Sequence, residues 1–350
     1  MKKVIFILCD VILCSSVSFT QTTHKTTHPL YTVANKIPVE GEGNWDLVTM
    51  DEPNWRLYLS HGQQAQALDV RTGKVIGSVT APYTKGVHGI AIANDLNKGF
   101  ISNGKDSSVT AFDLTSLKLY PRIKVTGANP DMILYDSFSH DVITFNGKSS
   151  NATIIKADSN KVIGTISLPG KPELAVSDEK GKIYLNIEDK NSVCVIDSKT
   201  WKIENTWKIA PGEEATGIAL DTKAHRLFLV CGNKRMIILD SDNGKFIQSL
   251  PIGDKADGVA FDPFLKRIYS SNGEGTLTVI QEINENTFNI LETVTTQKGA
   301  KTIALDTRTH FIYLPVAEYL ENSKDEEKDP KAKPMVKPNS FRVLVVKLDE

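Results

Sequence analysis

The stretch "DGVAFDPFLKRIYSSNGEGTLTVI", residues 257–280, consists of short apolar runs separated by turn residues. The runs mix Val, Ile, Phe, Tyr and Thr with small or polar residues, which is the pattern of β-strands. Pro and Asn-Gly mark the turns between them. The stretch therefore predicts successive antiparallel strands, and no segment of the chain shows sustained helical periodicity.

Related stretches recur along the chain. Two of them are "TGIALDTKAHRLFLVCGNKRMIILD" at 216–240 and "PELAVSDEKGKIYLNIEDKNSVCVID" at 172–197. Each repeat holds four strand patterns, named A to D in chain order. Four strands in roughly 40 residues are typical of a β-propeller blade. The repeats are 41 to 44 residues apart, and the position near the start of strand A is occupied in turn by Asp46, His88, Asp131, Glu173, Thr216, Asp257 and Lys301. We therefore expect an all-β fold, a seven-bladed β-propeller.

The two ends of the chain complement each other. The last repeat stops after "FRVLVVKL", residues 341–348, which is its strand C. The run "LYTVANKIPV", residues 30–39, precedes the first repeat and reads as a single strand. We expect this N-terminal strand to complete the last blade as its strand D, because that closes the ring and removes two exposed strand edges. Residues 30–350 are then one propeller domain.

These repeats resemble the YVTN-type repeat family, also called YncE-like propellers. The family repeat runs roughly Gly-Ile-Ala-Val-Asp, Leu-Tyr-Val-Thr-Asn and Val-Ser-Val-Ile-Asp, and "GIALD", "RLFLVCGN" and "MIILD" match it within 216–240. The similarity covers about residues 30–350. It implies the seven-bladed fold but no single function, since such propellers include binding proteins, scaffolds and lactonase-like enzymes.

The N-terminus has the pattern of an export signal. Two lysines precede the apolar run 4–14, and residues 18–20 fit a cleavage site. We expect residues 1–20 to be a signal peptide and 21–29 a flexible tail, with the mature protein periplasmic or secreted. Lipid anchoring through Cys14 is the alternative. The apolar run is too short to remain as a membrane span, so we expect no transmembrane segment.

Charge and cysteine content narrow the range of partners. The formal net charge is -1, so the chain carries no basic field that would attract nucleic acid. Cys194 and Cys231 lie in predicted strands of different repeats, which does not imply a disulfide. We expect a monomer whose partner is a small molecule or another protein.

We expect the polar residues at the start of strand A and at the end of strand B to lie together at one mouth of the central channel. In such a propeller the D–A and B–C connections share a face, so the start of strand A and the end of strand B both lie there. In the fourth repeat the end of strand B falls on Ile187 or Glu188. An Asn before Gly at the end of strand B is also explained by the turn that follows it, without any role in ligand binding. The candidate ligand-binding residues at this mouth are His61, His88, Asn103, Asp131, Asn146, Glu173, Glu188, Glu214, Asp257 and Asn272.

No cofactor is indicated by a motif, but a divalent metal ion is a candidate. Asn and carboxylate oxygens suit Ca²⁺, whereas His, Cys and carboxylate suit Zn²⁺ or copper. The candidate metal ligands are His61, His88, Glu173 and Asp257.

The sequence favours binding over catalysis without deciding between them. It contains no Gly-x-Ser-x-Gly, His-Glu-x-x-His, Cys-x-x-Cys or phosphate-loop motif. The first hypothesis is an exported binding protein with its ligand at the channel mouth. One alternative is a metal-assisted hydrolase, lactonase-like, that uses the same mouth. The other is an interaction scaffold that engages a partner through its rim and the charged, Pro-rich insertion 318–340 of the last blade.

Overall fold

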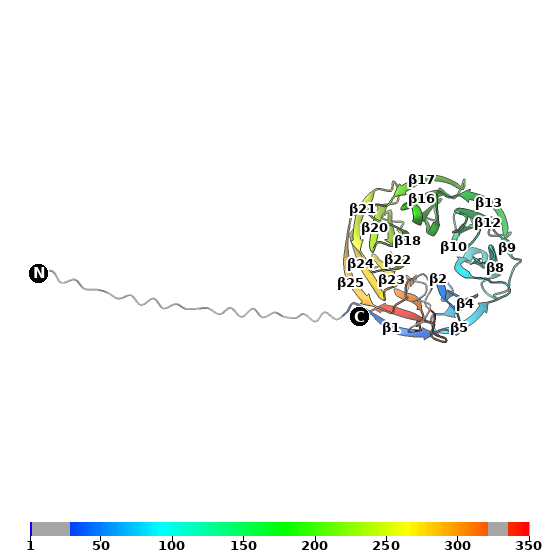
Figure 1. Cartoon of the computed structure of the whole chain (residues 1–350), viewed down its shortest axis with the longest axis horizontal. Coiled ribbons are helices and arrows are strands. Elements are labelled where there is room, and N and C mark those ends of the chain that lie inside the picture. The colour runs from blue at the N-terminus through cyan, green and yellow to red at the C-terminus, as the bar shows by residue number, and fades with distance from the viewer. Residues whose placement is uncertain (2–28, 321–334, 350) are drawn as a thin grey trace, which may run out of the picture.

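Each repeat folds as one four-stranded antiparallel sheet, and the described residues form seven such sheets around a central axis (Figure 1). The computed structural model describes residues 1, 29–320 and 335–349. Helix in these residues is limited to two 3-10 turns, η1 (Asn94–Leu96) and η2 (Glu188–Lys190). The predicted all-β, seven-bladed propeller is confirmed.

Strand A of each blade lies next to the axis and strand D at the rim, as Figure 1 shows for β2 and β5. The first three blades comprise β2 (Trp45–Asp51), β3 (Arg56–His61), β4 (Gln64–Asp69) and β5 (Lys74–Val79); β6 (Val87–Ala93), β7 (Lys98–Asn103), β8 (Ser108–Asp113) and β9 (Ile123–Lys124); and β10 (Pro130–Asp136), β11 (Asp141–Asn146), β12 (Asn151–Lys156) and β13 (Lys161–Ser167).

The next three blades repeat this order of strands. They comprise β14 (Pro172–Ser177), β15 (Lys182–Ile187), β16 (Ser192–Asp197) and β17 (Lys202–Lys208); β18 (Ala215–Asp221), β19 (Arg226–Cys231), β20 (Arg235–Asp240) and β21 (Phe246–Pro251); and β22 (Ala256–Asp262), β23 (Arg267–Asn272), β24 (Thr276–Asn284) and β25 (Thr287–Thr295).

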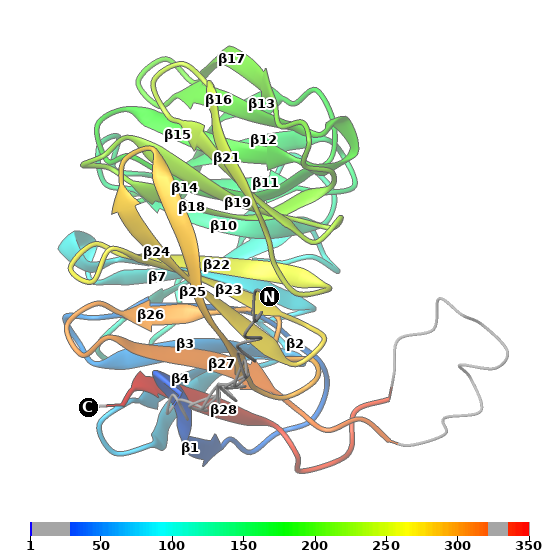
Figure 2. The same ribbon diagram turned by 90° about the vertical axis from the view of Figure 1, so that its left-hand side faces the viewer.

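The seventh blade joins the two ends of the chain. Its order is β1 (Tyr31–Pro38), β28 (Arg342–Leu348), β27 (Phe311–Val316) and β26 (Ala304–Asp306). Strand β1 runs antiparallel to β28, from Tyr31 opposite Leu348 to Pro38 opposite Arg342, and the two lie side by side in Figure 2. The predicted closure of the ring by the N-terminal strand is confirmed.

The core lies between neighbouring blades, because the middle strands are buried on both faces. Ile237, Ile238 and Leu239 of β20 are consecutive and fully buried. A continuous apolar run is expected where both faces of a sheet are covered. In one of the clusters, Ile154 of the third blade packs with Ile183 of the fourth. Seven sheets packed in this way give a rigid ring around the channel.

Part of the predicted domain organisation lies outside the described residues. This holds for the signal peptide 1–20 and the tail 21–29, apart from residues 1 and 29, and for the central part of the insertion 318–340. At the described ends of the insertion, Tyr319 pairs with Val336 in an isolated antiparallel bridge. No helix within the described ranges has the length and hydropathy needed to cross a membrane.

Candidate functional site

The position near the start of strand A forms a ring around one mouth of the central channel. In six blades it is the second residue of the inner strand, and the ladder to strand B is interrupted directly after the first residue. Such an interruption re-aims a side chain, as a β-bulge does. The ring, called the mouth ring below, consists of Asp46, His88, Asp131, Glu173, Thr216, Asp257 and Lys301.

Hydrogen bonds between blades fix the backbone of the mouth ring. The hydroxyl of Ser102 in the second blade donates to the carbonyl of Asp131 in the third, across 2.5 Å. The hydroxyl of Thr302 in the seventh blade donates to the carbonyl of Asp46 in the first, across 2.9 Å. Because these bonds cross blade boundaries, the ring positions are held by the propeller as a whole, which preorganises their side chains.

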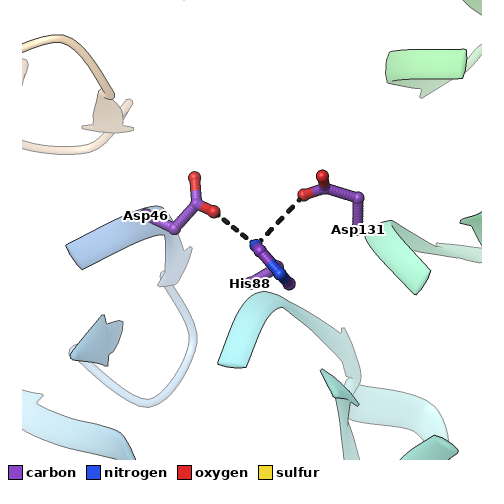
Figure 3. A group of neighbouring side chains, drawn as sticks. All are labelled: Asp46, His88 and Asp131. Carbon is purple, nitrogen blue, oxygen red and sulfur yellow. Dashed lines mark hydrogen bonds and ion pairs between the residues drawn. The ribbon is translucent and has the colours of Figure 1, made fainter. Parts of the chain in front are cut away.

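Three side chains of the mouth ring converge from three consecutive blades (Figure 3). Nδ1 of His88 lies 2.6 Å from Oδ2 of Asp46 and 3.4 Å from Oδ1 of Asp131. Burial raises the pKa of the Asp131 carboxyl, and the nearby carboxylates of Asp46 and Asp257 raise it further, whereas His88 opposes the shift. The imidazole therefore stands between two carboxylates that would otherwise repel each other.

Two lysines pair with other carboxylates at the same mouth. Nζ of Lys301 bonds to Asp257, and Nζ of Lys171 lies 2.7 Å from Glu173 and also bonds to Glu188. Burial raises the pKa of Glu173 to about 7, although Lys171 opposes the shift. Burial lowers the pKa of Lys301, but the carboxylate of Asp257 outweighs this and raises it above its ordinary value. Both ammonium groups therefore stay charged at neutral pH.

Carboxyl groups outnumber cationic groups at the mouth, and the channel below it is apolar. Five carboxyl groups, those of Asp46, Asp131, Glu173, Glu188 and Asp257, face two lysines and one histidine. The low dielectric of an apolar floor strengthens electrostatic interactions above it. A cavity of about 100 Å³ inside the channel is lined mostly by apolar side chains, among them Leu47, Ile90, Met132, Leu174, Val259 and Ile303, with Asp257, Thr49 and Thr302 as its polar members.

The prediction that His61 lies at the channel mouth is wrong. The side chain is fully buried, its ring stacks on Phe341 with 3.9 Å between ring centroids, and Nδ1 lies 3.0 Å from Oε1 of Gln66. His61 ends strand B, one strand away from the axis, so its side chain enters the seam between the first and seventh blades. It cannot contribute to a metal site with His88.

The three predicted asparagines at the end of strand B serve their own hairpins. Asn272 is fully buried, and its amide nitrogen donates to the hydroxyls of Thr276 and Thr278, each across 3.0 Å. Asn103 and Asn146 are buried in the same way and donate to hydroxyls of their neighbouring strands C. A side chain that is buried and satisfied inside its own blade does not face a ligand in the channel.

The remaining predicted residues lie near the ring but outside it. Strand β15 ends at Ile187, so Glu188 begins η2 and reaches the mouth through its ion pair with Lys171. Glu214 is exposed directly before β18 and has a left-handed φ of 51°. Lys171 was not predicted as a site residue. The feature of the sequence that could have indicated it is its position two residues before the ring residue Glu173.

The two cysteines of the described chain are free and buried, so no disulfide joins them. Burial raises the pKa of the Cys194 thiol to about 11 and that of Cys231 to about 12. A reactive cysteine needs the opposite shift, because the thiolate is the nucleophile. Both thiols are therefore packing residues.

Comparison with known proteins agrees with the fold. No protein-family model matches the chain. The protein YncE of Salmonella typhimurium is 23% identical over 312 residues, which is 82% of this chain and 86% of the relative.

Several solved structures superpose over most of the chain. A chain of a mitotic checkpoint complex has a TM-score of 0.73 at 11% identity and covers 96% of this chain and 99% of its own length. The structures of U3-55K, at 8% identity, and of the RRP9 WD40 repeats, at 7%, each have a TM-score of 0.72 and cover 89% of this chain and 97% of theirs. Similarity at this level of identity shows the fold alone.

Proposed function

We propose that this seven-bladed β-propeller, which is similar to YncE, is a binding protein whose ligand is held by the mouth ring. The observation that supports this is the position of His88 between the carboxylates of Asp46 and Asp131, in a ring fixed by bonds between blades. The function of a propeller is determined by the residues of such a site and not by the fold, which many unrelated functions share. The ligand class that fits best is a divalent metal ion.

The donor set of the three residues fits a transition metal. One imidazole nitrogen and two carboxylate oxygens are ligands that Zn²⁺ and related ions accept. One ligand atom from each residue lies within 4.8 Å of the others. A single ion about 2 Å from each atom needs the three atoms within about 4 Å of one another, so small shifts of the side chains would complete the site. The excess of carboxyl groups around the ring attracts a cation to it.

Titration calorimetry of the purified protein with ZnCl₂, NiCl₂ and CaCl₂ tests the proposal. We expect one transition-metal ion per chain, and no comparable binding by His88→Ala or Asp131→Asn. His140→Ala is the matched control, because His140 also pairs with an aspartate, Asp95, at 3.0 Å, but in an A–B turn on the opposite face. Equal binding by wild type and both ring variants contradicts the site.

A metal-assisted hydrolase at the same mouth is the second candidate function. Glu173 favours it, because a carboxyl with a pKa of about 7 can exchange a proton near neutral pH. Turnover of a panel of lactones by the metal-loaded protein, lost in Glu173→Gln, supports catalysis. Full metal binding without turnover supports binding alone.

We also infer that the protein acts outside the cytoplasm, because residues 1–20 have the pattern of an export signal. N-terminal sequencing of the processed protein should begin at Gln21. A product that retains residues 1–20 contradicts export by this route.

A further inference from the structure

A small cavity continues the central channel directly below the mouth ring. Its volume is about 100 Å³, and its lining residues lie in the inner strands of six blades or directly precede them. Apart from the ring residue Asp257 itself, each follows a ring residue by one to three positions. Since a strand rises about 3.3 Å per residue, this channel cavity begins within a few ångströms of the ring. The metal site proposed above does not use it.

The walls of the channel cavity are apolar and open. Although they lie at the centre of the propeller, five of the apolar side chains are partly exposed: Leu47, Met132, Leu174, Val259 and Ile303. Exposed apolar side chains that are grouped in one place mark a site for an apolar partner. Because these side chains are not covered by others, a ligand that enters from the mouth can contact them directly.

The polar side chains of the lining are used within the protein. The hydroxyl of Thr49 donates to a carbonyl of the second blade across 2.7 Å, and that of Thr302 donates to the carbonyl of Asp46 across 2.9 Å. The carboxylate of Asp257 pairs with Lys301 at the mouth. A water molecule inside a protein needs two to four polar partners, and apolar cavities stay dry. The channel cavity therefore suits an apolar group better than water.

The volume of the cavity limits the size of that group. An apolar cavity of about 150 Å³ holds one benzene molecule. In proportion, the channel cavity of about 100 Å³ has room for about four carbon atoms. An aliphatic chain of this length is the tail of a small molecule, so the polar head of the same molecule lies at the mouth.

The metal site at the mouth determines the head group. An ion held by Asp46, His88 and Asp131 has three protein ligands, which leaves a coordination position for a ligand from outside (Figure 3). A carboxylate oxygen is a ligand that Zn²⁺ accepts. An alkylamine is protonated at neutral pH, so its nitrogen has no lone pair for the ion. A carboxylate therefore fits the open position, whereas an amine does not.

We propose that the mouth binds a short-chain aliphatic acid, whose carboxylate coordinates the metal ion and whose chain of about four carbon atoms fills the channel cavity. This inference rests on the proposed function, because the metal ion holds the carboxylate. The acid takes the place of solvent at the ion, so its binding is reversible and involves no covalent step. The ion selects the head of the ligand, and the cavity selects the length of its chain.

A series of acids that differ only in chain length tests the proposal on the full, zinc-loaded chain. The probes are acetate, propionate, butyrate, pentanoate and heptanoate, with affinities measured by calorimetry. We expect the affinity to rise about fourfold for each methylene up to pentanoate, as burial of a methylene provides. Heptanoate should show no further gain, because its chain is longer than the cavity. The zinc-free protein should bind pentanoate no more tightly than 1-butanol, which has the chain without the carboxylate.

The results separate this inference from the proposed function. If zinc itself does not bind, the proposed function fails and this inference fails with it. If zinc binds but the affinities of the acids do not rise with chain length, only this inference is overturned. An equal rise with and without zinc also overturns it, because the carboxylate is then not held by the ion.

Two further measurements place the chain of the acid in the channel cavity. Leu174→Phe fills part of the cavity, so the gain with chain length should vanish while the affinity for zinc is kept. Leu291→Phe is the matched control, because Leu291 is exposed on the rim strand β25. In the wild type, methyl NMR should show the signals of Leu174 and Ile303 move when pentanoate binds. Unmoved signals overturn the proposal even if Leu174→Phe fails to fold.

Discussion

His88 of β6 and Asp46 of β2 face each other across the first blade boundary, with 2.6 Å between Nδ1 and Oδ2. A bond this short between imidazole and carboxylate is charge-assisted when the ring is protonated. Asp131 lies on the other side of the same nitrogen, at 3.4 Å. One proton on Nδ1 therefore occupies the place where a metal ion would meet all three side chains, and proton and metal compete for it.

Metal binding at the mouth ring should weaken as the pH falls. A metal ion binds the neutral imidazole, so wherever the His88 ring carries a second proton, metal binding releases that proton and the affinity rises with pH. Calorimetry in two buffers with different ionisation enthalpies measures the number of protons released, which should be largest at the acidic end of the range and fall as the pH rises. Asp131→Asn should lower the affinity for Zn²⁺ at least about tenfold. Binding that is independent of pH between 5 and 8 would contradict the role of Nδ1.

Removing the positive charge of Lys301 should strengthen cation binding. Its ammonium group pairs with Asp257 and also interacts with Asp46, so it opposes a cation in the ring. We expect Lys301→Met to raise the affinity for Zn²⁺ by about two- to tenfold at low ionic strength, and less at high salt. Lys266→Met is the control, because Lys266 pairs with Glu282 in an A–B turn away from the mouth. A similar gain in Zn²⁺ affinity in both variants would mean that the net charge of the protein causes the effect, and not the position of Lys301 in the ring.

The free energy of unfolding should fall as the pH rises from about 4.5 to 7, because of Glu173. Its pKa is raised from 4.5 to about 7, chiefly by burial, so in this window the folded protein holds a proton that the unfolded chain has released. Below the window both states are protonated and the contribution is complete; above it the contribution is lost. Glu173→Gln should therefore gain about 1–3 kcal/mol relative to wild type between pH 4.5 and pH 8.

Denaturant melts at both pH values measure this difference. Glu213→Gln, an exposed carboxylate near the same face, serves as the control and should show no such change. If Glu173→Gln follows the wild-type pH dependence, the Glu173 carboxyl is not held protonated in the folded protein.

The repeat explains why the fold and the mouth ring were predictable while the other positions were not. One repeat position maps onto one place in every blade, so aligning the repeats placed the seven ring residues at one mouth. The alignment did not single out the group of Asp46, His88 and Asp131: the predicted metal ligands were His61, His88, Glu173 and Asp257, of which only His88 belongs to that group.

The prediction for His61 was wrong because the direction of a side chain at the end of strand B depends on the packing between blades. Here the imidazole packs against Phe341, which comes from the far end of the chain. The prediction that Asn272 faces a ligand was wrong because an Asn-Gly turn reads the same in the sequence whether the Asn amide is buried in its own blade or points into the channel.

Asn272 should matter for stability and not for binding at the mouth. Its amide ties the end of β23 to Thr276 and Thr278 of β24. Asn272→Ala leaves the buried hydroxyl of Thr278 and the half-buried hydroxyl of Thr276 without this donor, which should cost about 1–3 kcal/mol of unfolding free energy. The affinity for Zn²⁺ should stay within the error of the wild-type value. A loss of metal binding in a variant that folds normally would show that Asn272 reaches the ligand after all.

Closure of the ring should depend on the hydroxyl of Tyr31. It lies 2.8 Å from the hydroxyl of Tyr269 in the sixth blade and accepts a bond of 2.6 Å from Arg267. Tyr31→Phe keeps the buried ring but leaves these two partners unsatisfied, so we expect a loss of about 1–3 kcal/mol in denaturant unfolding. Thr32→Val, which removes an exposed bond to Asp349, should change stability by less than about 0.5 kcal/mol. Equal stabilities of the two variants would mean that backbone pairing of β1 with β28 closes the ring without help from the Tyr31 hydroxyl.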